Sequence, residues 1–252
     1  MTAACGLVAF AIPDAACGDM PGHVLIAETK TTNINGIKFS FLEAPRAVTD
    51  TGDVFYQGNY SAPGVSYASG FWRGSGNVVQ ALASRGMTAP GGGVFQDVVS
   101  FTADHIANAG GYAVFMAEFR LPPSTTDIVG LYLVKPDGSS YRLAYEGQSA
   151  PGGGTFRDFQ FGTSWSVGPG GQVVFYAKTQ AGAGGGYYYA RLNGTTPVVT
   201  AVALHGDAAP EAEGTFLLNN LGFGAQRMAV NDSGLVTFRS ATTTNASAAL
   251  YQ

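Results

Sequence analysis

The side chains best suited to contact a ligand are gathered in two aromatic segments of the chain. Tyr187, Tyr188 and Tyr189 are contiguous, and Phe71 and Trp72 form a second group. Both segments are expected to be β-strands, in which consecutive side chains point to opposite faces, so one ring of each group could reach solvent. A ring at the surface can stack on a sugar or on a partner protein. We therefore take these five residues as candidate ligand contacts, with packing between neighbouring sheets as the alternative.

Two acidic residues, Asp97 and Asp158, are the candidates for hydrolytic chemistry. Hydrolysis of a glycosidic bond usually requires two carboxylates that flank the bond. These two follow Phe95 and Phe156 at the same distance in the sequence, and this repetition favours a structural role, such as holding the N–H groups of a glycine-rich loop. The chain has no Gly-x-Ser-x-Gly motif for a serine nucleophile. We therefore expect a protein that is not an enzyme.

Metal ions and cofactors are not predicted. The histidines His23, His105 and His205 are not equivalently spaced, and no His-x-x-x-His or Cys-x-x-Cys spacing is present to build a zinc site. Loops 50–53 and 231–234 carry Asp and Asn oxygens. Calcium takes about six to eight oxygen ligands, and turns closed by Asp or Asn side chains explain these loops more simply.

An internal repeat of about sixty residues dominates the chain. Its first marker is an Ala-Pro segment at Ala89, Ala150 and Ala209, which are 61 and 59 residues apart. Its second marker, Gly-x-Val/Ala-x-aromatic, begins at Gly6, Gly52, Gly111, Gly171 and Gly234. The two markers share one period, and the recurring aromatic residues are expected to anchor the core.

Glycine triplets follow two of the Ala-Pro pairs, at 91–93 and 152–154. Successive backbone N–H groups can form an anion-binding nest. Neither triplet ends in the Gly-Lys-Ser/Thr of a phosphate loop, and no helix is predicted to follow. We interpret both triplets as loops whose backbone requires positive φ.

Each repeat is predicted to contain strands and turns only. Examples of the first, second and third strand of a repeat are residues 173–176, 130–134 and 141–145. A fourth strand follows the Ala-Pro segment, as at 156–161. No segment has a helical period. Tandem four-stranded units are typical of β-propellers. The prediction is an all-β, β-propeller-like array of about four antiparallel blades.

The repeats divide a single domain, 1–252, into units of similar length. The expected units are 1–50, 51–108, 109–168, 169–230 and a partial unit 231–252. Pairing of the partial unit with 1–50 would close a ring and remove exposed strand edges. The alternative is a piece of a longer, open array.

The repeat resembles a bacterial tandem-repeat family known by the signature Asn-x-x-Gly-x-x-Ala-Phe. The residues that carry the resemblance are 108–115, 231–238 and the Gly-Asp-x-Ala-Pro element at 206–210. The signature Asn is replaced in the other units, by Ala3, Thr49 and Gly168. Proteins of this kind are generally exported and anchored at the cell surface, and no defined reaction goes with them. The resemblance therefore implies an extracellular or surface location.

Composition excludes several classes of function. The 13 basic and 17 acidic residues give a net charge of −4, so the chain lacks the basic excess that nucleic-acid binding requires. No apolar run is long enough for a transmembrane helix, and the first residues lack a basic segment typical of a signal peptide. Cys5 and Cys17 could form a disulfide or remain two thiols.

The favoured function is a non-catalytic, extracellular domain for binding or display. Its expected partner is a polysaccharide or another surface protein, and the chain is expected to be a monomer. A purely structural spacer and a propeller-type glycan hydrolase are the alternatives.

Overall fold

The computed structural model places β-strands throughout the residues that it describes. The described residues are 33–34, 36–43, 45, 47–76, 78–99, 107–159, 165–180, 184–212, 214–218, 228–244 and 249–251. Apart from one short 3-10 turn, Pro210–Ala212, the only regular secondary structure that they form is the β-strand. The predicted all-β class is therefore confirmed. Cys5, Cys17, His23, His105 and the marker at Gly6 lie outside the described residues.

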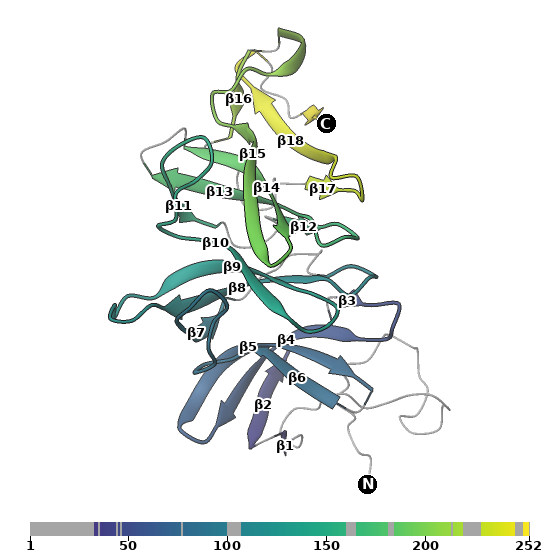
Figure 1. The fold of residues 1–252 in the computed structure, drawn as a ribbon, viewed down its shortest axis with the longest axis vertical. Helices are drawn as coiled ribbons and strands as arrows, with labels where there is room; N and C mark the ends of the chain where they lie inside the picture. Colours follow the sequence, from purple (N-terminus) through teal and green to yellow (C-terminus); the bar gives the residue numbers. More distant parts are fainter. Residues whose placement is uncertain are drawn as a thin grey trace.

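The strands form four antiparallel sheets that follow one another along the chain (Figure 1). Sheet 1 contains β1 (Asn33–Ile34), β2 (Ile37–Leu42), β3 (Ala47–Val48), β4 (Val54–Ala62), β5 (Val65–Ser75) and β6 (Val78–Ala83). Sheet 2 contains β7 (Val94–Val98), β8 (Ala113–Arg120), β9 (Ile128–Val134) and β10 (Ser140–Tyr145). Sheet 3 contains β11 (Thr155–Asp158), β12 (Trp165–Val167), β13 (Val173–Gln180), β14 (Gly185–Asn193) and β15 (Thr196–Leu204). Sheet 4 contains β16 (Phe216–Leu217), β17 (Met228–Val230), β18 (Val236–Thr242) and β19 (Ala249–Tyr251).

The strand after each Ala-Pro segment opens a sheet. We expected the strand at 156–161 to complete the unit that precedes it. Instead β11 pairs with β13, and β7 likewise pairs with β8. The Ala-Pro segments therefore connect one sheet to the next, and the grouping of strands differs from the expected one by one strand.

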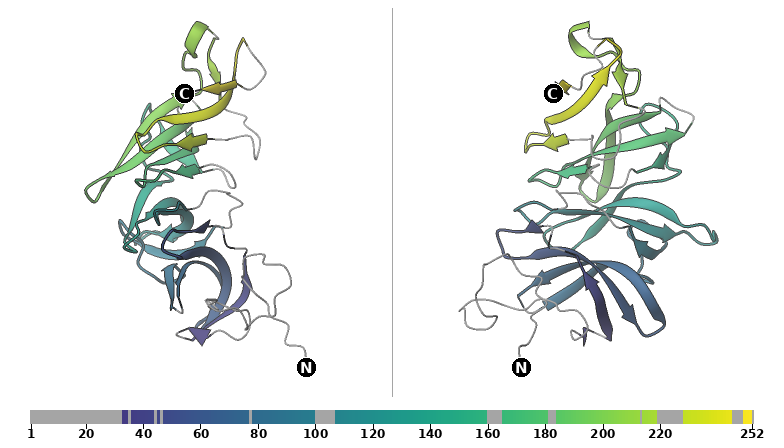
Figure 2. Two further views of the ribbon diagram at one scale, coloured as in Figure 1. Left: turned by 90° about the vertical axis from the view of Figure 1, so that its right-hand side faces the viewer. Right: turned by 180° about the vertical axis from the view of Figure 1, so that it is seen from behind.

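The four sheets are stacked in an open array. Sheet 1 and sheet 4 lie at opposite ends of the molecule in all three views (Figures 1 and 2). Within the described part of the chain, the strands of sheet 4 pair only with one another. The expected pairing of the last strands with those of the first unit is therefore not found there.

An aromatic triplet recurs in every sheet and explains the sequence period. In sheets 2, 3 and 4 the first ring comes from the strand after the Ala-Pro segment, and in sheet 1 it comes from β2, which no Ala-Pro segment precedes. The other two rings are cross-strand partners on the two strands that follow it in the pairing order of the sheet. The triplets are Phe39–Tyr56–Trp72, Phe95–Phe115–Tyr132, Phe156–Phe175–Tyr188 and Phe216–Phe238–Tyr251. The first and third rings meet edge to face in each triplet, with centroids 5.0, 5.1, 4.9 and 4.9 Å apart. All twelve side chains are buried, so the predicted core role of the recurring aromatics is confirmed for the described units.

Glycines make room for the third ring. Gly70 and Gly130 each precede it by two residues on the same strand face. A Cβ atom at Gly70 would lie 2.8 Å from the Trp72 ring, and one at Gly130 would lie 2.9 Å from the Tyr132 ring. The aromatic side chain thus packs against the backbone of the glycine, in the space that a side chain would otherwise fill.

Tight turns at one edge of the stack tie each sheet to the next. The Asn108 side-chain amide donates to the carbonyl of Gly168 at 2.5 Å, and the Gln172 side-chain amide donates to the carbonyl of Asp232 at 3.0 Å. Each bond spans 60 residues, which is one repeat. We call this edge, formed by residues 49–53, 108–112, 168–172 and 231–235, the turn edge.

Candidate functional site

Four of the five aromatic candidates lie in the interior. The exposed fractions of Phe71, Trp72, Tyr187 and Tyr188 are 0%, 1%, 0% and 1%. Trp72 and Tyr188 are the third rings of their triplets, and Phe71 stacks on Phe115 of the next sheet at 4.9 Å. The structure therefore supports the packing interpretation for these four, and they have no surface to offer a ligand.

Both tyrosines of this interior group are held by their surroundings. The Tyr187 hydroxyl donates to the carbonyl of Arg239 at 2.8 Å, which joins sheet 3 to sheet 4. Burial raises the pKa of the Tyr188 hydroxyl to about 12 and raises the pKa of Tyr187 further. Both groups thus stay neutral and structural at physiological pH.

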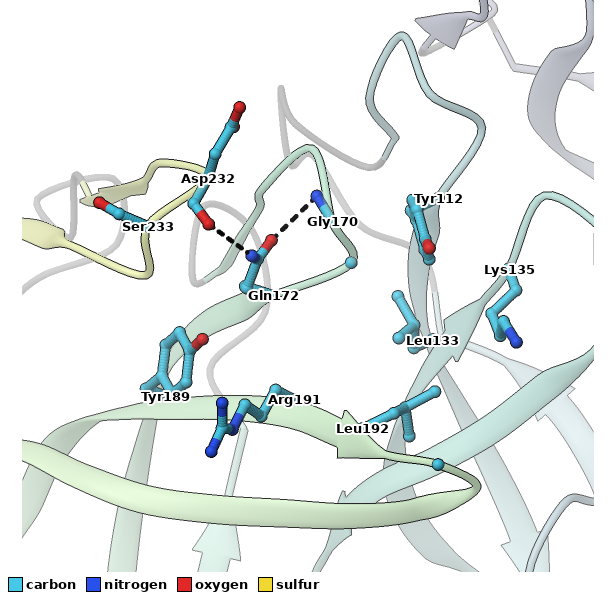
Figure 3. A pocket seen from close by; sticks show the side chains of 12 residues that line it. Tyr112, Leu133, Lys135, Gly170, Gln172, Tyr189, Arg191, Leu192, Asp232 and Ser233 are labelled. Carbon is cyan, nitrogen blue, oxygen red and sulfur yellow. Dashed lines mark hydrogen bonds between the residues drawn. The ribbon is translucent and has the colours of Figure 1, made fainter.

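Tyr189, the fifth candidate, lines a cavity at the turn edge (Figure 3). The cavity has a volume of about 400 Å³ and is lined by residues of sheets 2, 3 and 4. Tyr189 and Arg191 of β14 form one wall, whereas Tyr112 and Lys135 belong to sheet 2 (Figure 3). Gln172 lies between these two walls (Figure 3).

Gln172 is fixed in the cavity by hydrogen bonds from both ends of its side chain. Its Oε1 accepts from the N–H of Gly170 at 2.9 Å, and its Nε2 donates to the carbonyl of Asp232 at 3.0 Å (Figure 3). The amide therefore has a set orientation before any ligand arrives. A preorganised polar group of this kind lowers the entropic cost of binding.

Both cavity tyrosines lie against the glycines of the second repeat marker. A Cβ atom at Gly171 would be 2.5 Å from the ring of Tyr112, and one at Gly234 would be 3.0 Å from the hydroxyl of Tyr189. These glycines have φ of +78° and +81°, a region that side chains other than Gly rarely adopt. The turns thus support the two rings from behind, and both rings remain partly exposed.

Two cations, Lys135 and Arg191, line the cavity, and neighbouring groups compensate only the first. Lys135 Nζ lies 3.8 Å from an Asp137 carboxylate oxygen and 5.8 Å from the Tyr141 ring centroid. Arg191 is exposed, and no carboxylate in the described part of the chain forms an ion pair with it. The carboxylate of Asp232 points away from Gln172 and from Arg191 (Figure 3). The charged residues that line the cavity are thus two cations and one aspartate, in a protein whose net charge is −4.

The residue after each marker glycine is the signal that the sequence analysis missed. This position holds Asp53, Tyr112, Gln172 and Leu235 in successive sheets. Asp53 is buried and pairs with Arg73, whereas Tyr112 and Gln172 line the cavity. The marker residues on either side recur in every sheet, whereas the residue directly after the glycine differs from sheet to sheet. Such variation is expected where this residue has a different role in each sheet.

The acidic candidates lie outside this cavity and differ in their contacts. Asp97 accepts from the N–H of Ser69 at 2.7 Å and of Val98 at 3.0 Å, so it ties sheet 2 to β5 and does not hold a glycine loop. Asp158 lies 3.7 Å from Lys178 Nζ. The cross-strand partner of Asp97 is Glu118, whose pKa is raised by burial and by the charges of Asp127 and Asp97.

The glycine turns and the Asx turn at 231–234 take the predicted forms, whereas the turn at 50–53 does not, because Thr49 Oγ1 and not an Asp oxygen accepts from the N–H of Asp53 at 3.0 Å. All six glycines of the two triplets have positive φ. Arg142 donates to the carbonyls of Gly91 and Gly92 at 2.6 and 3.1 Å. The first triplet therefore binds a cationic side chain through its carbonyl oxygens. The Asn231 side chain accepts from the N–H of Leu235 at 2.9 Å. His205 Nδ1 accepts from the N–H of Leu218 at 3.1 Å, a contact within the fold.

The described residues contain no group of three or more His, Cys, Asp or Glu side chains arranged to hold a metal ion. No helix among them is long and apolar enough to cross a membrane.

Comparison with known proteins identifies one matching family. A model described as a family of unknown function (DUF7453) matches residues 22–187, which is more than half of the chain. No curated protein matches the chain significantly.

Proposed function

Since the chain belongs to the DUF7453 family, whose description names no activity, we propose from the geometry that it is a non-catalytic domain that binds a saccharide. The observation that carries the proposal is the cavity at the turn edge, with two partly exposed tyrosine rings and an oriented Gln172. Aromatic rings supply flat apolar area for the face of a sugar. Fixed amides supply directional hydrogen bonds to its hydroxyls.

The scaffold of this proposal is a β-propeller-like array in which rigid sheets present short turns. Each sheet buries its triplet, and side-chain bonds one repeat apart hold the turns in register. A site built from such turns keeps its shape without a ligand, so little binding energy is lost to ordering. We propose an extracellular or cell-surface location in a bacterium, supported by the resemblance of the markers to exported repeat proteins, and a monomeric chain.

Thermal unfolding of the full chain tests the proposal against the rival function of a structural spacer. A saccharide panel is added at high concentration, in calcium or in EDTA. A ligand at 100 times its Kd adds about 2.7 kcal/mol to the free energy of unfolding, and this raises the midpoint by several degrees in a chain of this size. A midpoint that no saccharide moves would favour the spacer.

Two substitutions locate the binding. Tyr189→Ala and Tyr112→Ala are expected to abolish the ligand-induced rise in midpoint, because each removes one ring from the cavity. Tyr67→Ala is the matched control, since Tyr67 is 59% exposed and lies outside the cavity. A saccharide response that survives both cavity substitutions would place the site elsewhere.

A further inference from the structure

The cavity is lined by positively charged side chains, which binding of a neutral saccharide does not require. Its walls carry two cations, Lys135 and Arg191, from different sheets. The whole chain has only 13 basic residues. The one carboxylate-bearing residue that lines the cavity, Asp232, uses its main-chain carbonyl there and directs its side chain away (Figure 3).

Arg191 is the better placed of the two cations for a ligand. Neighbouring groups already attract Lys135, because a carboxylate oxygen of Asp137 and the ring of Tyr141 lie near its amine. The guanidinium of Arg191 is exposed beside Tyr189, with no ion-pair partner in the described part of the chain. A guanidinium presents a planar pair of donors that matches a carboxylate.

We propose that the cavity binds an acidic polysaccharide, with Arg191 contacting the carboxylate of one uronate unit and Lys135 attracting a second acidic unit. This inference rests on the proposed function and specifies its ligand class. The partly exposed rings of Tyr112 and Tyr189 favour a saccharide over an acidic peptide, because they offer flat faces on which pyranose rings stack. Gln172, whose amide is already oriented in the cavity, supplies the hydroxyl contact (Figure 3).

Calorimetric titration of the full chain with matched probes tests the inference. The probes are galacturonate, glucuronate and mannuronate tetramers, their methyl esters, and tetraglutamate. The methyl ester keeps the sugar and removes the charge. We expect at least one acidic tetramer to bind about tenfold more tightly than its ester, since a charge-assisted pair is worth roughly one order of magnitude or more in affinity. We also expect this affinity to fall as salt rises.

Variants identify the cation responsible. Arg191→Gln is expected to reduce affinity for the acidic tetramer about tenfold and to leave affinity for the ester unchanged, with a smaller loss for Lys135→Gln. Arg157→Gln is the control, because Arg157 is exposed on β11 and does not line the cavity. Each variant is checked for an unchanged unfolding midpoint.

The possible results separate the inference from the function on which it rests. Equal affinity for acid and ester, or an Arg191→Gln variant that binds the acid as the original does, overturns the acidic preference and leaves saccharide binding intact. Tetraglutamate binding as tightly as the sugar overturns the saccharide class. Failure of every sugar, acidic or neutral, overturns both proposals.

Discussion

Phe115 and Tyr132 are cross-strand partners whose rings stack with centroids 5.1 Å apart and planes 14° from parallel. The equivalent pair in sheet 3, Phe175 and Tyr188, stacks at 5.6 Å and 26°. This pair is therefore a unit of the repeat, and its rings separate one sheet from the preceding one. Its importance can be measured directly in sheet 2, at the middle of the hydrophobic core.

Tyr132→Ala is expected to lower the free energy of unfolding by about 3–5 kcal/mol, because it leaves a large cavity beside Phe95 and Phe115. Denaturant unfolding at constant m-value measures the loss. Tyr67→Ala, at an exposed tyrosine of sheet 1, should change stability by no more than about 0.5 kcal/mol. Similar effects of the two substitutions would mean that the triplet is not the core of the sheet.

Tyr56 departs from the repeat in a way that predicts a stabilising change. Three sheets have Phe at this position, and the buried Tyr56 hydroxyl has no hydrogen-bond partner in the structure described. Burial raises its pKa above the ordinary value for tyrosine. Tyr56→Phe should therefore raise the free energy of unfolding by about 1 kcal/mol.

Tyr187→Phe is the opposite case and the matched control for Tyr56→Phe. It removes the hydrogen bond from the Tyr187 hydroxyl to the carbonyl of Arg239, so it should cost about 0.5–1.5 kcal/mol. Both variants are compared by the same denaturant unfolding. A loss of stability in Tyr56→Phe would show that the hydroxyl has a partner, against the packing described.

Glu118 and Lys178 occupy equivalent positions opposite Asp97 and Asp158. Because burial and neighbouring carboxylates raise the pKa of Glu118, its charge opposes folding above its folded-state pKa, and the penalty disappears as pH falls through that pKa. Glu118→Gln should stabilise the protein at pH 7 by a few tenths of a kcal/mol, and the gain should shrink toward pH 4.

Lys178→Gln is the control of opposite sign for Glu118→Gln. It loses the attraction to Asp158 and should destabilise the protein slightly at pH 7. Thermal unfolding across pH 4–8 follows both variants. A gain in Glu118→Gln that is independent of pH would argue against a charge effect.

The outer face of sheet 4 differs chemically from the same face of sheet 3. Thr237 and Arg239 replace the fully buried Val174 and Tyr176, and Arg239 is exposed. A polar outer face keeps a repeat from associating through its end. Thr237→Val with Arg239→Tyr should therefore cause concentration-dependent self-association in sedimentation experiments. Arg157→Tyr, at an exposed arginine of β11, should not. Unchanged sedimentation of the double variant would contradict this role of the face.

The sequence period predicted the aromatic core but not which neighbour each edge strand joins. Phe39, Phe95, Phe156 and Phe216 recur because every sheet needs the first ring of its triplet. The strand that carries this ring lies between two repeats in the sequence. Whether it pairs with the preceding or the following sheet depends on backbone hydrogen bonds between distant residues, which no local sequence pattern encodes. The boundary of each sheet therefore differed from the expected one.

The site was harder to predict because a strand inside a stack is covered on both faces. Alternation along Tyr187, Tyr188 and Tyr189 correctly places neighbours on opposite faces, but sheet 2 covers Tyr188 and sheet 4 covers Tyr187. Tyr189 is accessible because it lies toward the turn edge, where a cavity opens between the sheets. The exposure of a side chain thus depends on its position along the strand. The alternation of side chains between the two faces does not predict it.

The most direct test of saccharide binding at the turn edge is an amide NMR titration of the assigned chain with acidic oligosaccharide. The account predicts the largest shift changes at Gly170, Gly171 and Ser233, and predicts that Arg191→Gln needs about tenfold more sugar to reach them. Shift changes confined to residues outside the cavity, such as Ser69 and Val98, or none at saturating sugar, would contradict it.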